Sequence, residues 1–298
     1  MTLIAHDERL HELVDPEAAP EQLGTGFGFI EGPVWDAAER RLLFSDVPGD
    51  TRWAWSEAKG VVEVAGATGK ANGMAFDDQG RLYVCHHAWS NVTRIDPNGF
   101  ETIVAKEYEG WALNSPNDVV VRSDGLVFFT DPHYGRVNPD HGVPRPMELD
   151  HRGVYALQPD TRKLSLVADD FEAPNGLCFT SDEATLYVND SERRDIRRFD
   201  VAADGMLSGG EVVFNVPVDD SIGPGNPDGM KLDEHGNIWV SGPGGIWVLT
   251  SDGRHLGIIR IPEDTANFCW GEDTELYVCA TSSLYRLRTK VRGCRRAG

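Results

Sequence analysis

Asp228-Gly229-Met230-Lys231-Leu232-Asp233 is the clearest copy of a phrase that this chain repeats six times. The phrase starts with an acidic or amide residue and continues with small and apolar residues. A polar turn, Asp233-Glu234-His235-Gly236, follows it, and then a second apolar run, Ile238-Trp239-Val240. Two short apolar runs on either side of an Asp- and Gly-rich turn predict a β-hairpin.

The other five copies are spread over the rest of the sequence. They begin at Glu31, Asn72, Asn117, Asn175 and Asn267. Their spacing of about 40 to 58 residues is close to the ~40–50 residues of a four-stranded propeller blade. Helical periodicity is nearly absent, and a short helix is expected only around residues 7–14. We therefore predict an all-β six-bladed β-propeller, with 1–298 as a single domain, a lead-in at about 1–25 and a basic tail at about 289–298.

The composition limits the partners and the compartment. The net charge is −20, and a field of this sign repels nucleic-acid phosphates and anionic membranes, so we expect neither partner. No apolar run approaches the ~20 residues of a membrane span, and the first residues lack the features of a secretory signal. The five scattered cysteines indicate reduced thiols in a cytoplasmic protein. Since a closed propeller leaves no free sheet edge, we expect a monomer or a weak homo-oligomer.

The first residues of the phrases predict a ring of oxygen donors. In a propeller the innermost strands line a central channel, and equivalent positions of the repeat lie at equal heights around it. The ring consists of carboxylates and amides: Glu31, Asn72, Asn117, Asn175, Asp228 and Asn267. A turn preference explains any single Asn or Asp before Gly, but it does not explain Glu31. Oxygen donors without Cys or His favour Ca²⁺, Mg²⁺ or Mn²⁺, so we predict a metal site in the central channel.

Five short motifs in order carry a resemblance to a known family. They are Glu31-Gly32-Pro33-Val34-Trp35, Ser115-Pro116-Asn117-Asp118, Thr130-Asp131-Pro132, Pro174-Asn175-Gly176-Leu177 and Pro227-Asp228-Gly229-Met230. From about Phe29 to Arg288 the chain resembles the SMP-30/gluconolactonase/luciferin-regenerating-enzyme family. The resemblance implies a six-bladed propeller with one catalytic divalent cation. Ca²⁺ is the favoured ion, and Mg²⁺, Mn²⁺ and Zn²⁺ are the alternatives.

The resemblance also implies roles for particular residues. Glu31, Asn175 and Asp228 would bind the metal directly, and Asn117 would lie beside it, in contact with substrate or a metal-bound water. Ser115 occupies a position where some relatives carry a sugar-binding arginine, which puts that substrate contact in question. Asp118 would lie close to the pocket.

A long loop from Pro132 to Arg152 is expected to shape the site. Loops of this length in a compact fold often act as lids. The alternative is that this segment is a surface loop without a role in the site. His133, at the start of this loop, would join Asn117 and Asp118 as a polar group that contacts a hydroxylated substrate.

The implied reaction is the metal-dependent hydrolysis of a sugar-acid lactone to the free aldonic acid. A metal ion would polarise the carbonyl group, and Asp228 would act either as general base or as nucleophile. The alternatives are organophosphate hydrolysis on the same metal site and a non-catalytic calcium-binding propeller. The sequence contains no Gly-x-Ser-x-Gly motif, so a metal-free serine hydrolase is not expected.

Overall fold

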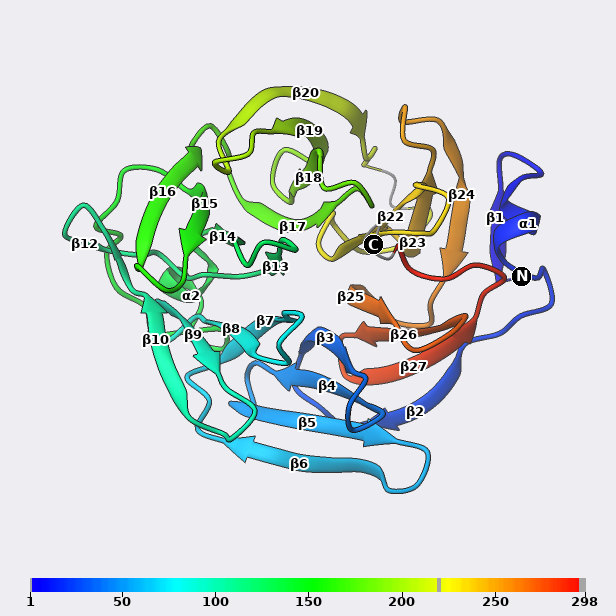
Figure 1. Ribbon diagram of the computed structural model, residues 1–298. Coiled ribbons are helices and arrows are strands. Elements are labelled where there is room, and N and C mark those ends of the chain that lie inside the picture. The colour runs from blue at the N-terminus through cyan, green and yellow to red at the C-terminus, as the bar shows by residue number, and fades with distance from the viewer. Residues whose placement is uncertain (1, 219–220, 295–298) are drawn as a thin grey trace.

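The computed structural model describes residues 2–218 and 221–294. Within them, six antiparallel sheets stand in a ring around a central channel, so the predicted six-bladed β-propeller is confirmed (Figure 1). In each sheet the strand nearest the channel is the first of its blade, and consecutive inner strands contact each other around the ring.

The first three blades follow the chain from the inner strand outwards. Blade 1 consists of β3 (Ile30–Asp36), β4 (Arg41–Asp46), β5 (Thr51–Ser56) and β6 (Gly60–Gly66). Blade 2 consists of β7 (Ala71–Phe76), β8 (Leu82–His86), β9 (Asn91–Ile95) and β10 (Glu101–Ala105). Blade 3 consists of β13 (Val119–Val121), β14 (Val127–Asp131), β15 (Gly153–Gln158) and β16 (Lys163–Ala168).

The last three blades include both ends of the described chain. Blade 4 consists of β17 (Pro174–Phe179), β18 (Thr185–Asp190), β19 (Asp195–Val201) and β20 (Leu207–Asn215). Blade 5 consists of β21 (Met230–Leu232), β22 (Ile238–Gly242), β23 (Gly245–Leu249) and β24 (His255–Arg260), with β1 (Leu3–Ala5) at its outer edge. Blade 6 consists of β25 (Thr265–Trp270), β26 (Glu275–Ala280) and β27 (Ser283–Arg288), with β2 (Glu21–Thr25) as its outer strand.

The N-terminal strands close the ring. β2 pairs with β27, so that segments 258 to 265 residues apart hydrogen-bond in one sheet. β1 pairs in the same way with β24. Two outer edges are thus covered by chain from the other terminus, which protects backbone groups that would otherwise be unpaired.

Short elements occupy the connections. The helix α1 (Leu10–Leu13) lies within the segment 7–14 expected to be helical, and its two buried leucines pack against blades 5 and 6. The ribbon of β11 (Glu107–Tyr108) and β12 (Trp111–Ala112) precedes the inner strand of blade 3, and the helix α2 (Tyr134–Val137) lies between β14 and β15. No helix in the described ranges has both the length and the apolar character needed to cross a bilayer.

The hydrophobic core is divided between the blades. Each neighbouring pair of blades encloses one cluster of buried side chains, for example Leu42 and Phe44 of blade 1 with Tyr277 and Cys279 of blade 6. Complete burial of one such side chain contributes about 1.5–3 kcal/mol. Because this packing lies between the sheets, the channel itself remains available for polar groups.

The glycine of the repeated phrase allows adjacent blades to approach each other. Gly32 has a φ of +58°, and a Cβ atom there would lie 1.9 Å from the carbonyl oxygen of Asn72. At the next blade, the backbone N–H of Gly73 donates to the carbonyl of Asn117 at 2.8 Å. Both glycines belong to inner strands and do not form turns. At these positions the backbone of one inner strand contacts the backbone of the next blade beside the channel.

Candidate functional site

One end of the channel, which we call the polar end, holds a cavity of about 210 Å³. The first residues of five of the six phrases line it, together with residues from the connections between strands and from the start of β25. The lining consists of Phe29, Glu31, Asn72, His87, Asn117, Tyr134, His141, Asn175, Ser191, Asn226, Asp228, Asp264, Thr265 and Ala266. The predicted metal ligands Glu31, Asn175 and Asp228 and the predicted contact Asn117 are therefore brought together. None of the described lining residues is Lys or Arg.

The sixth position of the ring is Ala266, and the prediction of Asn267 there is wrong by one residue. The backbone N–H of Gly229 donates to the carbonyl of Ala266 at 2.8 Å, just as that of Gly73 donates to the carbonyl of Asn117. Asn267 lies one position further along the strand, where its Nδ2 donates to Glu31 Oε2 at 3.0 Å. It therefore positions a ring carboxylate and does not belong to the ring.

Burial and mutual repulsion disfavour the charged forms of the ring carboxylates. Glu31 is 3% exposed, and Asp228 is half-buried in the cavity wall. Burial, and secondly the charge of Asp118, raises the pKa of Glu31 to about 7. Burial, followed by the charges of Glu31 and Asp118, raises the pKa of Asp228 well above its usual range. A cation bound between these groups would favour their charged forms, because its positive charge would offset the repulsion between the carboxylates and lower their pKa values.

Ser191 fixes the orientation of the Asn175 side chain. The Ser191 hydroxyl donates to the carbonyl of Pro227 at 2.5 Å, so its oxygen is left to accept the Asn175 Nδ2 group at 2.9 Å. A carboxamide whose nitrogen is held in this way turns its oxygen to the other side. Asn175 therefore presents an oxygen donor among the groups that line the cavity.

Asp118 and Lys231 lie below the ring, further along the channel. Asp118 is 4% exposed, its Oδ1 accepts the backbone N–H of Val119, and its buried Oδ2 has no hydrogen-bond partner among the described residues. The nearest cation is Lys231, whose Nζ lies 3.8 Å from Asp118 Oδ2. Asp118 is thus close to the cavity, as expected, but it does not line it.

The predicted loop 132–152 is fastened over the polar end. His141 stacks on Phe29, with ring centroids 5.2 Å apart, and Tyr134 and His141 both line the cavity. Lys70 Nζ donates to the carbonyl of Asp140 at 2.9 Å, and Arg145 Nη2 donates to Ser90 Oγ at 2.5 Å. These contacts hold the loop against blade 2.

Two predicted substrate contacts lie outside the cavity lining. Ser115 is fully buried, and its hydroxyl donates to the carbonyl of Pro132 and accepts the backbone N–H of Gly135. His133 Nε2 lies 3.3 Å from Glu192 Oε1 at the surface. In this structure Ser115 anchors the start of the loop, and His133 points to an acidic neighbour.

Sequence reasoning missed several residues that line the cavity: Phe29, Tyr134, His141, Ser191, Asn226 and Asp264. Each lies in a connection or next to a strand end, outside the phrase that identifies the ring. The only signal for Tyr134 and His141 is their place in the long loop. The buried Tyr134 hydroxyl has a raised pKa, chiefly because of burial, and it stays protonated.

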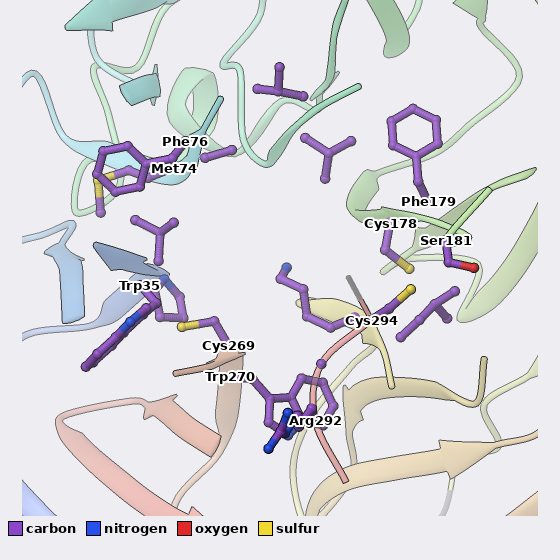
Figure 2. A pocket seen from close by; sticks show the side chains of 18 of the residues that line it. Trp35, Met74, Phe76, Cys178, Phe179, Ser181, Cys269, Trp270, Arg292 and Cys294 are labelled. Carbon is purple, nitrogen blue, oxygen red and sulfur yellow. The ribbon is translucent and has the colours of Figure 1, made fainter. Parts of the chain in front are cut away.

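A second, larger cavity of about 410 Å³ lies at the other end of the channel, which we call the apolar end (Figure 2). Its floor is formed by the residues three positions after the ring: Val34, Ala75, Val120, Cys178, Lys231 and Cys269. Figure 2 shows Met74, Phe76, Phe179 and Trp270 around the same opening. The apolar end therefore has the larger cavity, whereas the polar end has the side chains suited to binding and catalysis. We assign the functional site to the polar end, because carboxylates and oriented amides converge only there among the described residues of the two cavities.

Comparisons with known proteins agree with the architecture. The model of the SMP-30/gluconolactonase/LRE-like region matches residues 29–282. A gluconolactonase of Zymomonas mobilis is 32% identical, over 96% of this chain and 85% of its own length. The solved structure of a gluconolactonase from Xanthomonas campestris is 34% identical, with a TM-score of 0.89, over 97% of this chain and 95% of that one.

A more distant structure shares the fold. The calcium-binding protein regucalcin from Agrobacterium tumefaciens superposes with a TM-score of 0.76 at 19% identity, over 94% of this chain and 97% of that one. The match of the family model over most of the sequence and the 32% identity decide the assignment. This chain belongs to the SMP-30/gluconolactonase/LRE-like family.

Proposed function

We propose that this protein hydrolyses a sugar-acid lactone to the free aldonic acid at the polar end of its channel. The reaction would depend on a divalent cation held by Glu31, Asn175 and Asp228. The observation that carries the proposal is the convergence of two carboxylates, the buried Glu31 and the half-buried Asp228, with an oriented amide in one cavity. The similarity to gluconolactonases supports the substrate class. The proposal takes 1–298 as one domain, because β1 and β2 complete the last two blades.

The donor set fits a hard cation. The described residues contain no group of three or more His, Cys, Asp or Glu side chains suited to a metal ion, so binding here would need an amide oxygen as well. Asn175 supplies that oxygen. Oxygen donors of this kind favour Ca²⁺, with Mg²⁺ and Mn²⁺ as alternatives.

The protein residues then divide the chemical work. A bound cation would supply Lewis acidity toward the lactone carbonyl and would balance the charges of Glu31 and Asp228. Asp228 accepts the proton of the attacking water, whose oxygen bonds to the carbonyl carbon. The ring C–O bond breaks, and the proton passes to the departing ring oxygen. Asn117 orients the substrate beside Asp228.

The character of the lining favours a hydroxylated substrate. Asn, Ser, Thr, Asp, Tyr and His side chains make up most of the wall, whereas an organophosphate hydrolase should have a mainly apolar one. When only substrate hydroxyls can hydrogen-bond to buried polar groups of a site, the site discriminates strongly against molecules that lack those hydroxyls. A polyhydroxylated lactone therefore fits this wall better than a fluorophosphate.

A pH-indicator assay tests the proposal. Purified protein would be offered γ- and δ-aldonolactones and one fluorophosphate, before and after chelation, with Ca²⁺, Mg²⁺, Mn²⁺ and Zn²⁺ restored separately. We expect acid release from at least one lactone, its loss on chelation and its return with one ion. Activity on the fluorophosphate alone, or lactone hydrolysis that survives complete chelation, would contradict the proposal. Incorporation of ¹⁸O from labelled water into Asp228 in a single turnover would replace the general base by a covalent nucleophile.

A further inference from the structure

His87 lies in the wall of the polar end, directly after β8. It is 1% exposed, and its ring contacts three groups. Nδ1 is 3.2 Å from the carbonyl oxygen of His141 in the loop. Nε2 is 3.1 Å from Asn72 Nδ2 and 3.3 Å from Asn117 Nδ2. One imidazole therefore joins the loop to two adjacent members of the ring.

The partner of Nδ1 determines the tautomer of this ring. A carbonyl oxygen only accepts hydrogen bonds, so Nδ1 must carry the hydrogen. The other nitrogen of a neutral imidazole is then an acceptor. Burial lowers the pKa of His87 to about 3, and the ring remains neutral at ordinary pH. Nε2 consequently accepts hydrogen bonds and cannot donate one.

An acceptor at Nε2 determines the orientation of both asparagine side chains. Each must turn its NH₂ group toward His87, and each carboxamide oxygen then points away from the imidazole of His87. Asn72 shows the consequence, since its Oδ1 is buried and has no hydrogen-bond partner among the described residues. A buried acceptor without a partner is energetically unfavourable unless a ligand satisfies it.

We propose that His87 is a positioning residue that turns the carboxamide oxygens of Asn72 and Asn117 into the cavity as hydrogen-bond acceptors for substrate hydroxyl groups. The ligand class is a polyhydroxylated lactone, and this part rests on the proposed function. The orientation of the two amides rests only on the contacts of His87. Ser191 orients Asn175 by the same principle, with a fixed acceptor on the nitrogen side of the amide.

The first test reads the tautomer of His87 directly. Long-range ¹H–¹⁵N spectra of the protein labelled at histidine, assigned with the His87→Gln variant, distinguish Nδ1–H from Nε2–H. We expect the Nδ1–H form without titration between pH 5.5 and 8. An Nε2–H form, or a titration in this range, would overturn the proposal. This result does not depend on which reaction the protein catalyses.

The second test compares two substitutions of similar size. His87→Gln retains an acceptor that can reach both amides, whereas His87→Leu removes it. For the hydroxylated lactone found active, we expect KM to rise about tenfold or more in His87→Leu with kcat nearly unchanged, because uniform binding is lost. His87→Gln should stay within about threefold of the parent protein, since its acceptor replaces Nε2.

A lactone without hydroxyl groups, δ-valerolactone, separates positioning from general damage to the site. Its KM should be the same in His87→Leu and the parent protein. An equal loss on both lactones, or an equal loss in the Gln and Leu variants, would overturn the proposal. If no lactone is hydrolysed by the parent protein, the proposed function fails, and the NMR experiment still decides the role of His87. Thermal unfolding of each variant confirms that the compared proteins are folded.

Discussion

The two ends of the channel are built from the same six inner strands, yet they differ in almost every chemical property. At the polar end the strands present two carboxylates, three amides and one alanine. Three positions further along, they present valine, alanine, cysteine and a single lysine. The apolar end is the larger cavity, at about 410 Å³ against about 210 Å³.

The difference shows where side chains are held in place by their neighbours. At the polar end, Ser191, His87 and Asn267 each fix the direction of a ring side chain through a hydrogen bond. At the apolar end the side chains face an opening, and only Lys231 carries charge on its floor. Orientation costs conformational entropy, so such supporting contacts are expected where chemistry needs fixed geometry.

The largest expected effect comes from a substitution at the polar end. Asp228→Asn removes the proposed base while keeping the size of the side chain, and we expect the lactonase rate to fall about 10³-fold or more. Its counterpart at the apolar end, Val120→Leu, should change the rate by less than about twofold. Steady-state kinetics on both variants, with circular dichroism as a control for folding, checks the contrast. Equal activity of Asp228→Asn and the parent protein would favour a non-catalytic propeller.

A smaller effect is expected from Lys231, which lines the apolar end and lies close to Asp118 below the ring. Lys231→Met removes the positive charge 3.8 Å from Asp118 Oδ2 and keeps an unbranched side chain. Because less positive charge then faces the proposed site, we expect Ca²⁺ to bind about three- to tenfold more tightly. Without Ca²⁺ the free energy of unfolding should fall by about 1–3 kcal/mol, as Asp118 loses its nearest counter-charge.

Calorimetric titration with Ca²⁺ and denaturant unfolding measure these two quantities. Arg292→Met is the matched control, since Arg292 also borders the apolar end but pairs with Asp273 at 2.6 Å at the surface. It should leave Ca²⁺ affinity unchanged. An unchanged Ca²⁺ affinity in Lys231→Met would contradict the expectation that the charge of Lys231 acts on the cation site at the polar end.

The smallest functional effect is expected from the thiols of the apolar end. Burial raises the pKa of Cys178 and of Cys269 to about 12, so only about 10⁻⁴ of each thiol is ionised at pH 8. Both should react slowly with Ellman's reagent although they line an opening, and their modification should leave lactonase activity unchanged. The half-buried Cys294 should react first, and Cys294→Ser should remove that early phase. Rapid labelling of Cys178 or Cys269 would show that the apolar end opens more than the structure indicates.

Much of the fold follows from the sequence because the repeat is long and its period is characteristic. Six phrases with hairpin turns fit few architectures, and equivalence within the repeat brings Glu31, Asn175 and Asp228 to one height. The same reasoning misplaced Asn267, because Ala266-Asn267 lacks the glycine that marks the register elsewhere. Asn117-Asp118 also lacks it, and Asp118 correspondingly lies one level below the ring.

The supporting contacts could not be predicted in this way. His87 meets Asn72 and Asn117, which are 15 and 30 residues away, and the carbonyl of His141, 54 residues away. No local pattern encodes these distances, since they depend on how the loop crosses the channel. Asn or Asp before Gly also suggested turns, whereas the structure shows strands whose glycines admit the backbone of the next blade.

Anomalous X-ray diffraction from crystals soaked in Mn²⁺ would locate the cation of the proposed site. We expect one strong peak at the polar end, within about 2.0–2.6 Å of oxygen atoms of Glu31, Asn175 and Asp228, and its loss in Asp228→Asn crystals. A channel without a peak at these residues, or a peak confined to the apolar end, would contradict this expectation.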